Sequence, residues 1–351
     1  MDSLNILITG AGAPGIKGSI YSLKNNYDKR KVMIYGTDVK DNVVGKYLCD
    51  HFYTISHSSK SQNYINDLID ISNKNNIDII IPQNTLELEL LSRNQKVFQS
   101  INTKVIISNN QSIINSNNKL LLMKKCEELN IPVGKYYIVN NKNSLINKAK
   151  LLKWPENKLV VKPPLSNGSR GVRIVDEKTD LKNLFYNEKP SSMYTNLDML
   201  VKVLGEEFPD LIITEYLPGF EYTVDVFKGE SMYIIPRKRY SIKSGISFDS
   251  VLEKSSKIIS FSKKLSNNLQ LEYCFGFQFK MDENNIPKII ECNPRVQGTM
   301  VMSTMAGANI IYSSVKHAIG EKVPNLNINW DTRFTRYWGG VSINKKEIKI
   351  I

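Results

Sequence analysis

The chain has 351 residues, of which 41% are hydrophobic and 23% are charged, and its formal net charge at pH 7 is +13. This composition is ordinary for a folded globular protein and excludes a mainly disordered or collagen-like chain. The positive charge favours an anionic partner, but much of the lysine lies among asparagine and isoleucine, so the charge is a weak sign of function.

Short apolar strands alternate with helical segments over residues 1–112. This alternation predicts a parallel sheet with crossover helices, that is, a Rossmann-like doubly wound α/β domain. The expected strands are Leu4–Thr9, Lys31–Thr37, Ile77–Pro82 and Lys104–Ser108. Three helices are expected: one that ends at Leu23, one at Tyr64–Asn73 and one at Leu86–Phe98.

The pattern changes after a leucine-rich helix expected at Ser116–Leu129. Strands are expected at 135–139, 159–162, 172–175 and 211–215, with a polar surface loop near 187–196. From Tyr222 the pattern is antiparallel, with strands at 222–227 and 231–239, a helix at 250–269, a hairpin at 279–295 and a last helix at 310–319. A second, α+β unit is therefore expected.

Two loops are rich in glycine. Gly10 to Gly15 reads G-x-G-x-x-G between a strand and a helix, and Asp38 ends the next strand, which is the context of a dinucleotide fingerprint. Because Pro14 stiffens the loop, we favour a structural or substrate-facing turn, and an NAD(P) site stays the alternative.

The second loop follows a strand that ends in Lys162. Small residues and two glycines, Ser166-Asn167-Gly168-Ser169-Arg170-Gly171, allow backbone N–H groups to close over phosphate oxygens, and Lys162 supplies a point charge. An ordinary flexible hairpin with an exposed lysine is the alternative.

The most informative stretch is Phe279 to Arg295, which predicts a hairpin whose returning strand ends in Glu-x-Asn-Pro-Arg. Glu291 and Asn293 leave the same face of the strand, and pairing about the turn brings Gln278 roughly opposite Glu291. Three oxygen donors suit Mg²⁺, and Arg295 adds a fixed cation with a planar fork of donors. Magnesium beside arginine is typical of phosphoryl transfer.

Together these segments resemble the ATP-grasp superfamily, in particular the branch of carbamoyl-phosphate synthase large subunits and biotin carboxylase. The resemblance covers most of the chain and implies an ATP-grasp fold: the N-terminal doubly wound parallel α/β domain and an ATP-grasp domain over 113–320. The latter comprises a small α+β lid at about 130–214 and a central antiparallel-sheet α+β subdomain at about 215–320, and the tail 321–351 packs on the central domain.

In that family the adenine nucleotide lies between the lid and the central domain. The resemblance implies that Lys119, Lys162 and the loop from Ser166 to Gly171 contact its phosphates. It also implies that the backbone of Glu215, Tyr216 and Leu217 reads the adenine, and that Glu221 binds the ribose hydroxyls.

The metal ligands implied by the resemblance are Gln278, Glu291 and Asn293. Gln278 stands where other members use glutamate, so one or two Mg²⁺ ions are expected, for which Mn²⁺ can substitute. Arg295 is expected at the γ-phosphate and at the developing acyl phosphate. Arg237 and Arg239 share one face of a strand and could grip a substrate carboxylate, unless they are solvated cations on an edge strand.

The expected activity is that of an ATP- and Mg²⁺-dependent carboxylate–amine ligase that works through an acyl phosphate, with Arg295, Lys162 and Arg237 as catalytic residues. The alternatives are a carbamoyl-phosphate-synthase-like kinase or carboxylase acting on bicarbonate or another carboxylate, an oxidoreductase, or a non-catalytic nucleotide-binding protein. The expected partners are small carboxylates and amines, with a possible homodimer and no nucleic acid. The four cysteines form no C-x-x-C pair and no apolar run could cross a bilayer, so a cytoplasmic protein without membrane contact is expected.

Overall fold

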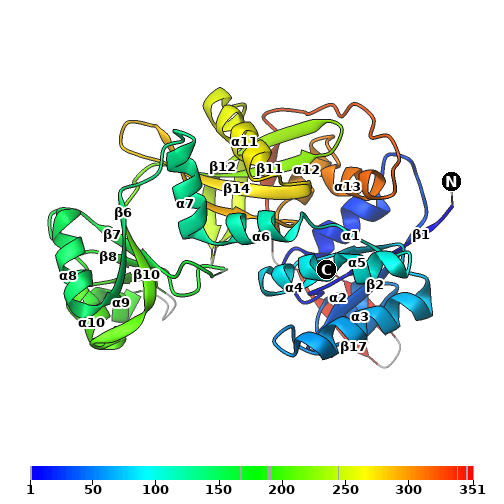
Figure 1. Cartoon of the computed structure of the whole chain (residues 1–351), viewed down its shortest axis with the longest axis horizontal. Coiled ribbons are helices and arrows are strands. Elements are labelled where there is room, and N and C mark those ends of the chain that lie inside the picture. The colour runs from blue at the N-terminus through cyan, green and yellow to red at the C-terminus, as the bar shows by residue number, and fades with distance from the viewer. Residues whose placement is uncertain are drawn as a thin grey trace. The chain divides into compact units, whose positions relative to one another are not determined.

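In the computed structural model the chain folds into two compact units (Figure 1). The first unit contains residues 1–117, 221–279 and 291–351, and the second contains 118–220 and 280–290. The predicted division at 112, 214 and 320 stays a prediction. The described residues are 2–166, 168–187, 192–243, 245–337, 339–344 and 347–350.

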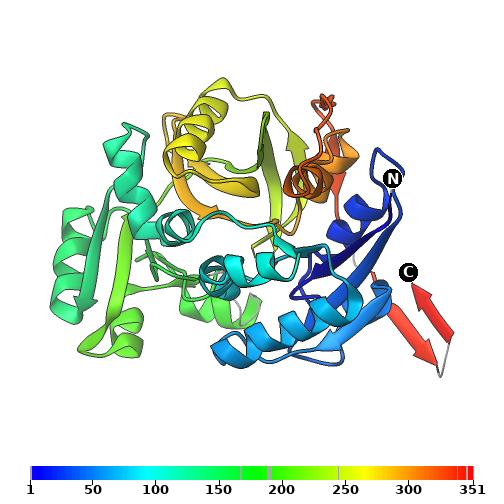
Figure 2. The same cartoon turned by 45° about the vertical axis from the view of Figure 1, so that its right-hand side comes forward.

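The N-terminal sheet has five parallel strands in the order β3-β2-β1-β4-β5, with helices on both faces (Figure 2). Alternate side chains of β1 enter two different cores: Leu7 packs with α3, whereas Ile6 and Ile8 pack with α1. This confirms the predicted doubly wound α/β domain. Its strands are β1 (Leu4–Ile8), β2 (Val32–Asp38), β3 (His51–Thr54), β4 (Ile79–Ile81) and β5 (Lys104–Val105), and its helices are α1 (Ile16–Lys24), α2 (Gly45–Leu48), α3 (Ser61–Asn75), η1 (Thr85–Glu87), α4 (Leu88–Arg93), α5 (Gln95–Ser100) and α6 (Asn110–Asn117).

Two details of this domain differ from the prediction. The single helix expected at Leu86–Phe98 is three short pieces, because Asn84 caps η1 with a capping box and the helical run stops at Asn94 before α5 begins. Strand β3 was not predicted, since its burial pattern has exposed ends and no fully buried residue.

The second unit is built on a mixed sheet in the order β6-β10-β7-β8-β9, in which only β8 and β9 are parallel. Helix α8 packs against β6 and β10 over a core that includes Leu145, Leu159 and Ile213 (Figure 1). The elements are α7 (Lys119–Glu128), β6 (Tyr136–Asn141), α8 (Lys142–Leu151), β7 (Leu159–Lys162), β8 (Arg173–Val175), α9 (Leu181–Asn187), β9 (Tyr194–Thr195), α10 (Leu197–Leu204) and β10 (Glu207–Glu215).

The helix predicted at Ser116–Leu129 starts later than expected, because Asn118 interrupts it. Its side chain accepts hydrogen bonds from the backbone of Leu120 and Leu121, so it caps a new helix, α7, and Ser116 belongs to α6. The polar loop predicted near 187–196 lies in part outside the described residues, and its end forms β9.

The central sheet of the first unit has the order β15-β14-β11-β12-β13-β16. Strand β13 takes the residues from Ile246 to Leu252, so the helix predicted to start at Ser250 starts at Ser256 instead. Strand β12 is internal, so the idea that Arg237 and Arg239 lie on an edge strand is wrong. The elements are β11 (Glu221–Lys228), β12 (Met232–Lys243), β13 (Ile246–Leu252), α11 (Ser256–Asn268), β14 (Tyr273–Met281), β15 (Pro287–Asn293), α12 (Val301–Met305), α13 (Ile310–Ala318) and β16 (Arg333–Thr335).

One apolar core joins the N-terminal sheet to the central sheet. Ile6 and Ile34 of the N-terminal sheet belong to the same buried cluster as Phe227 and Ile235 of the central sheet and Ile311 of α13. This shared core explains why residues 1–117 and 221–279 form a single compact unit.

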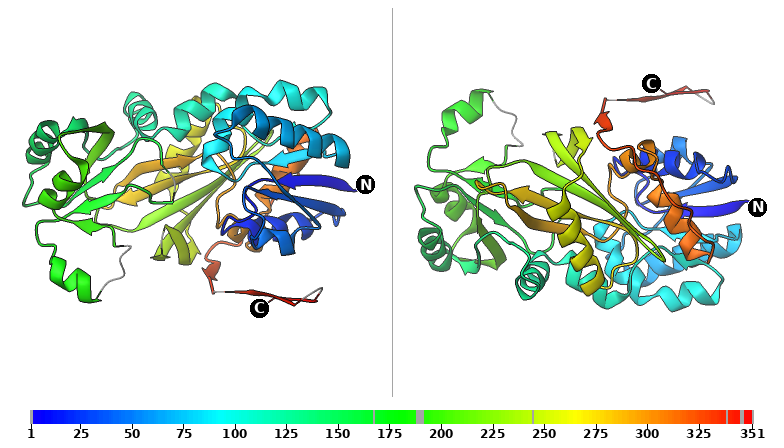
Figure 3. Two further views of the ribbon diagram at one scale, coloured as in Figure 1. Left: turned by 90° about the horizontal axis from the view of Figure 1, so that it is seen from below. Right: turned by 90° about the horizontal axis from the view of Figure 1, so that it is seen from above.

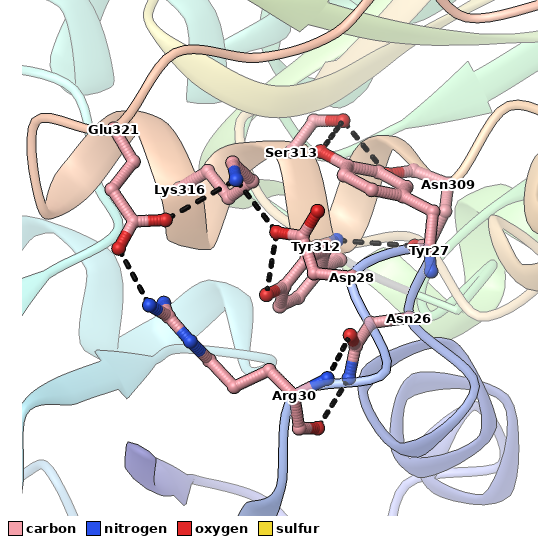
Figure 4. Close-up of polar contacts among 9 residues, drawn as sticks. All are labelled: Asn26, Tyr27, Asp28, Arg30, Asn309, Tyr312, Ser313, Lys316 and Glu321. Carbon is pink, nitrogen blue, oxygen red and sulfur yellow. Dashed lines mark hydrogen bonds and ion pairs between the residues drawn. The ribbon is translucent and has the colours of Figure 1, made fainter. Parts of the chain in front are cut away.

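A polar network reinforces this joint (Figure 4). The Lys316 ammonium of α13 donates to Asp28 at 2.6 Å and lies 3.2 Å from a carboxylate oxygen of Glu321, which accepts a 2.6 Å hydrogen bond from Arg30. The Tyr312 hydroxyl also donates to Asp28, at 3.1 Å. Because the Arg30 and Lys316 side chains are only 6% and 7% exposed, each of these cations needs its acidic partner.

The C-terminal segment has two parts. Strand β16 pairs with β13 in the central sheet, whereas β17 (Val341–Asn344) and β18 (Glu347–Ile350) pair with each other in a separate two-stranded sheet (Figure 3). In the described part of the chain, no helix has the length and apolar character needed to span a membrane.

Candidate functional site

Two buried lysines of the second unit are held beside backbone oxygens. Lys119, the first residue of α7, donates from Nζ to the Ser166 carbonyl at 3.0 Å and to the Ser166 hydroxyl at 3.2 Å. Lys162 ends β7, and its Nζ lies 3.4 Å from the carbonyl oxygen of Ile290. The two side chains are 5% and 8% exposed. An ammonium group that is desolvated in this way interacts strongly with an anion.

The loop after Lys162 depends on its glycines. Gly168, Ser169 and Gly171 have φ angles of +57°, +59° and +73°, in the left-handed region that favours glycine. A Cβ atom on Gly171 would lie 2.7 Å from Cγ of Pro163. Asn167, also predicted to contact phosphate, lies outside the described residues. The loop is therefore a tight turn that needs glycine at these positions, and it lies beside Lys119 and Lys162.

The predicted adenine-reading segment ends β10. The backbone N–H groups of Glu215 and Tyr216 donate to the carbonyls of Lys135 and Lys158, at 3.0 and 3.2 Å. In the described structure the N–H group of Leu217 makes no such bond. Of the three residues, Leu217 is therefore the one whose backbone donor is available in this conformation.

The side chains of this segment are flanked by cations. The Glu215 carboxylate accepts from Lys288 Nζ at 2.8 Å and from the backbone N–H of Lys135 at 3.1 Å. The ring of Tyr216 has Lys280 Nζ at 5.3 Å and Lys158 Nζ at 5.9 Å from its centroid. Lysine side chains thus lie beside both Glu215 and Tyr216.

The Glu-x-Asn-Pro-Arg run of the first unit forms a hydrogen-bonded row. Asn293 donates from Nδ2 to Glu291 Oε1 at 3.0 Å, and Arg295 donates from Nη2 to Asn293 Oδ1 at 3.3 Å. Glu291 and Asn293 lie on β15, and Gln278 lies half-buried on the neighbouring strand β14. All three predicted metal ligands therefore lie on adjacent strands.

The donor set fits a magnesium ion that keeps other ligands. Among the described residues, no group of three or more His, Cys, Asp or Glu side chains could enclose a metal ion. Glu291 offers one carboxylate, and Asn293 and Gln278 offer neutral amide oxygens. Mg²⁺ commonly binds one or two carboxylates and completes its shell with water and phosphate oxygens, which this set allows. The number of ions stays a prediction.

Arg295 links this row to the N-terminal domain. Its Nε donates to the Thr85 hydroxyl at 3.2 Å and its Nη1 to the Val296 carbonyl at 2.8 Å. Although the side chain keeps some accessible surface, crowding by protein atoms desolvates the guanidinium and lowers the pKa of Arg295, while the charges of Glu291 and Glu87 oppose this shift.

The sequence analysis did not single out Thr85 or the buried Glu87 beside it. Glu87 accepts hydrogen bonds from the hydroxyls of Thr9, at 2.5 Å, and Tyr64, and from the backbone of Gln83 and Asn84. Burial raises the pKa of Glu87, and these donors oppose the shift. A signal existed: these residues follow β4, where the strand order reverses, and ligands of doubly wound sheets bind at that point.

Arg237, predicted to be catalytic, is fully buried. Its Nη2 donates to Asp225 and its Nη1 to the Thr299 carbonyl, both at 2.7 Å, and Asp225 also accepts from Ser303 at 2.6 Å. To grip a substrate carboxylate, Arg237 would have to exchange these partners, so its catalytic role stays a prediction.

Glu221, predicted to bind ribose, faces Arg239 across β11 and β12 and forms an ion pair with it. Arg239 also donates to the Ser247 hydroxyl and the Gly245 carbonyl, each at 2.7 Å. The pair fixes the carboxylate of Glu221 in place. Its contact with a ribose stays a prediction.

The first glycine loop is occupied by contacts within the chain. The Gly12 N–H donates to Asp38 Oδ2 at 2.8 Å, so the carboxylate that would bind a ribose in a dinucleotide site serves the loop itself. A Cβ atom on Gly15 would lie 2.6 Å from Cα of Gly298. These contacts favour the structural turn over the NAD(P) alternative.

Two families match separate parts of this sequence. Residues 207–336 match the family described as ATP-grasp in the biosynthetic pathway with Ter operon, and residues 6–106 match the PylC-like N-terminal domain. No curated protein sequence matches the chain significantly.

Solved structures with the same fold cover nearly the whole chain. N5-carboxyaminoimidazole synthetase from Staphylococcus aureus, complexed with ADP, has a TM-score of 0.68 and 15% identity, covering 94% of this chain and 81% of its own. Biotin carboxylase from Campylobacter jejuni, in a β,γ-ATP complex, has a TM-score of 0.67 and 17% identity, covering 92% and 73%. The L-amino acid ligase from Bacillus licheniformis has a TM-score of 0.60 and 13% identity, covering 91% and 74%.

These matches agree with the parallel N-terminal sheet, the mixed sheet of the second unit and the antiparallel central sheet. Together with the ATP-grasp family match over residues 207–336, they confirm the predicted ATP-grasp fold.

Proposed function

We propose that this protein is an ATP- and Mg²⁺-dependent ligase that joins a carboxylate to an amine through an acyl phosphate. The hydrogen-bonded row of Glu291, Asn293 and Arg295 is the observation that carries the proposal, because it combines oxygen ligands for Mg²⁺ with a cation that touches the N-terminal domain. Solved structures of the same fold are complexes with ADP or with β,γ-ATP, which supports a nucleotide substrate.

The chemistry has two steps. A carboxylate oxygen attacks the γ-phosphorus of ATP and ADP leaves, which forms an acyl phosphate. The amine nitrogen then attacks the acyl carbon, phosphate leaves, and the nitrogen loses a proton. Phosphoryl transfer needs positioned charge rather than a nucleophilic side chain, so fixed cations and a bound Mg²⁺ are sufficient.

We assign the roles of the residues by their chemistry. Lys119 and Lys162 hold phosphate oxygens, and Glu291 and Asn293 would hold Mg²⁺, which would neutralise phosphate charge. Arg295 stabilises the charge that develops on the transferred phosphoryl group. In the second unit, the loop of Ser166, Gly168, Ser169 and Gly171 covers the phosphates, and the Leu217 N–H reads the adenine.

Thermal unfolding tests the nucleotide part of the proposal. Mg²⁺ with ATP should raise the melting temperature of the protein, and NADH should not, because only a ligand of the folded state stabilises it. If NADH raised the melting temperature and ATP did not, the ligase proposal would be wrong.

Glu291→Gln tests the metal ligand. It should weaken the Mg²⁺-dependent part of ATP binding and leave the small Mg²⁺-independent part unchanged. Glu283→Gln makes the same change in the exposed turn before β15 and should behave like the wild-type protein. Equal effects of both variants would exclude Glu291 as a ligand.

A phosphate-release screen over pairs of carboxylates and amines then identifies the reaction. Bicarbonate belongs in the carboxylate set, since biotin carboxylase shares the fold and a carboxylase or kinase remains the second candidate. Phosphate release that needs a carboxylate and an amine supports the ligase. Release with bicarbonate that no amine increases supports the second candidate.

A further inference from the structure

Arg336 lies directly after β16, and its guanidinium reaches two exposed loops of the first unit. Nη1 lies 3.4 Å from the carbonyl oxygen of Pro14, in the first glycine loop, and Nη2 lies 3.2 Å from that of Gly298. Both are long hydrogen bonds to uncharged carbonyl acceptors, and each uses only one of the two hydrogens on its nitrogen. Nη1 and Nη2 each keep a second hydrogen that these two bonds do not use.

Arg336 differs from the other arginines of this sheet. Arg237, Arg239 and Arg333 each form an ion pair, with Asp225, Glu221 and Asp249. Among the described residues, no carboxylate lies within ion-pair distance of Arg336.

The cation of Arg336 is also partly desolvated. Burial lowers the pKa of Arg336 and no neighbouring acid opposes the shift, and the Nε atom is buried without a hydrogen-bond partner among the described residues. A half-buried guanidinium without an anion costs free energy that an oxyanion would recover.

The position of Arg336 connects it to the proposed chemistry. Gly298, which accepts its hydrogen bond, lies three residues after Arg295 in the same loop. On the other side, the backbone of Gly298 touches Gly15, at the end of the loop that contains Pro14. Arg336 therefore lies where the first glycine loop meets the loop that follows the hydrogen-bonded row of Glu291, Asn293 and Arg295.

We propose that Arg336 binds the carboxylate group of the non-nucleotide substrate through the free hydrogens of Nη1 and Nη2. This assignment rests on the proposed ligase function. It makes Arg336 a residue that selects a carboxylate substrate, separate from the groups that hold ATP. The N–H donors of a guanidinium lie in one plane, which suits a planar carboxylate.

The test compares two arginine variants of one segment. Arg336→Gln removes the proposed carboxylate ligand, and Arg333→Gln makes the same charge change at a side chain that is 64% exposed and paired with Asp249. In the presence of Mg²⁺ and ADP, the melting temperature is measured against acetate, succinate, L-alanine, L-glutamate and inorganic phosphate, each matched with sodium chloride at equal ionic strength.

At least one carboxylate should raise the melting temperature of the wild-type protein and of Arg333→Gln. The carboxylate concentration that gives half of the rise, the midpoint, should be the same for both. Arg336→Gln should need about 10–100 times more of it, the loss expected for a hydrogen bond to a charged group. Arg336→Lys, which keeps the charge and loses the fork, should lie between them, and it replaces Arg336→Gln if the glutamine variant does not fold.

The assignment would be wrong if Arg336→Gln kept the wild-type midpoint, if Arg333→Gln lost as much, or if phosphate alone gave a response. Absence of any response to carboxylates would also overturn it. Failure of the ligase proposal itself is seen separately, as absence of stabilisation by Mg²⁺ and ATP.

Discussion

Gly15 and Gly298 are in close contact, and replacing each of them by alanine should have unequal effects on stability. A Cβ atom on Gly15 would lie 2.6 Å from Gly298 Cα and 3.2 Å from its carbonyl oxygen. A Cβ atom on Gly298 would lie 3.9 Å from both Cα and N of Gly15, which is ordinary van der Waals contact. Gly15→Ala should therefore destabilise the protein much more than Gly298→Ala.

The magnitude follows from the backbone of each residue. Gly15 has φ −87° and ψ −9°, which alanine adopts without strain, so by itself the substitution would stabilise the fold by about 0.4–1 kcal/mol. The 2.6 Å contact is with backbone that cannot rotate away, and overpacking of this kind costs about 1–3 kcal/mol. We expect a net loss of about 1–2 kcal/mol for Gly15→Ala and a change near zero for Gly298→Ala.

Thermal and urea unfolding of both variants measure this difference. A loss of 1 kcal/mol lowers the melting temperature of a domain of 150–250 residues by about 2–4 °C, so the two variants should be clearly separated. If Gly15→Ala were as stable as the wild-type protein, or if both variants lost the same stability, the contact would not have the geometry described.

Three other predictions concern charged residues. Lys119→Ala should raise the Kd for Mg²⁺ and ADP, measured by calorimetry, about tenfold or more, since it removes a charged donor to phosphate. Lys124→Ala, on the exposed face of the same helix, should leave this Kd unchanged. Arg237→Gln should lower the unfolding free energy by about 3–5 kcal/mol, because it leaves the buried Asp225 without its cation; a fully stable variant would contradict this. Burial alone would raise the pKa of Glu321, but the cations of the Figure 4 network hold it below its ordinary 4.5. Its stabilising contribution should thus be present above about pH 4.5 and lost as the pH falls through the lowered pKa, so urea unfolding should separate Glu321→Gln from the wild-type protein at neutral pH and progressively less below pH 4.5.

Local patterns were enough to predict much of the fold. The parallel N-terminal sheet followed from apolar runs that alternate with helical segments, and the turn before β15 followed from Asp282 to Asn285. In the structure Asp282 Oδ1 accepts hydrogen bonds from the backbone of Asn284 and Ile286, as expected for an aspartate turn. Such features depend on neighbours in sequence, so the sequence alone reveals them.

Contacts between distant segments could not be predicted. Nothing near Gly15 shows that its partner is Gly298, so the glycine loop equally matched a dinucleotide fingerprint. The burial of Arg237 depends on Asp225 of the neighbouring strand and on the Thr299 carbonyl, and Arg336 follows a three-residue strand with no strong pattern. These sites required the three-dimensional pairing of the central sheet.

The shared core of the first unit has a consequence for synthesis on the ribosome. The N-terminal sheet and its helix α1 emerge first, but α12 and α13, which pack on α1 in the same apolar core, are made last among the helices of that core. At about 5–20 residues per second, the roughly 200 residues between the two take about 10–40 s to translate. During that time α1 exposes the apolar face that these two helices later cover. A fragment that stops at Asn117 would keep that face exposed permanently, so it should aggregate or bind chaperones rather than fold as an independent domain.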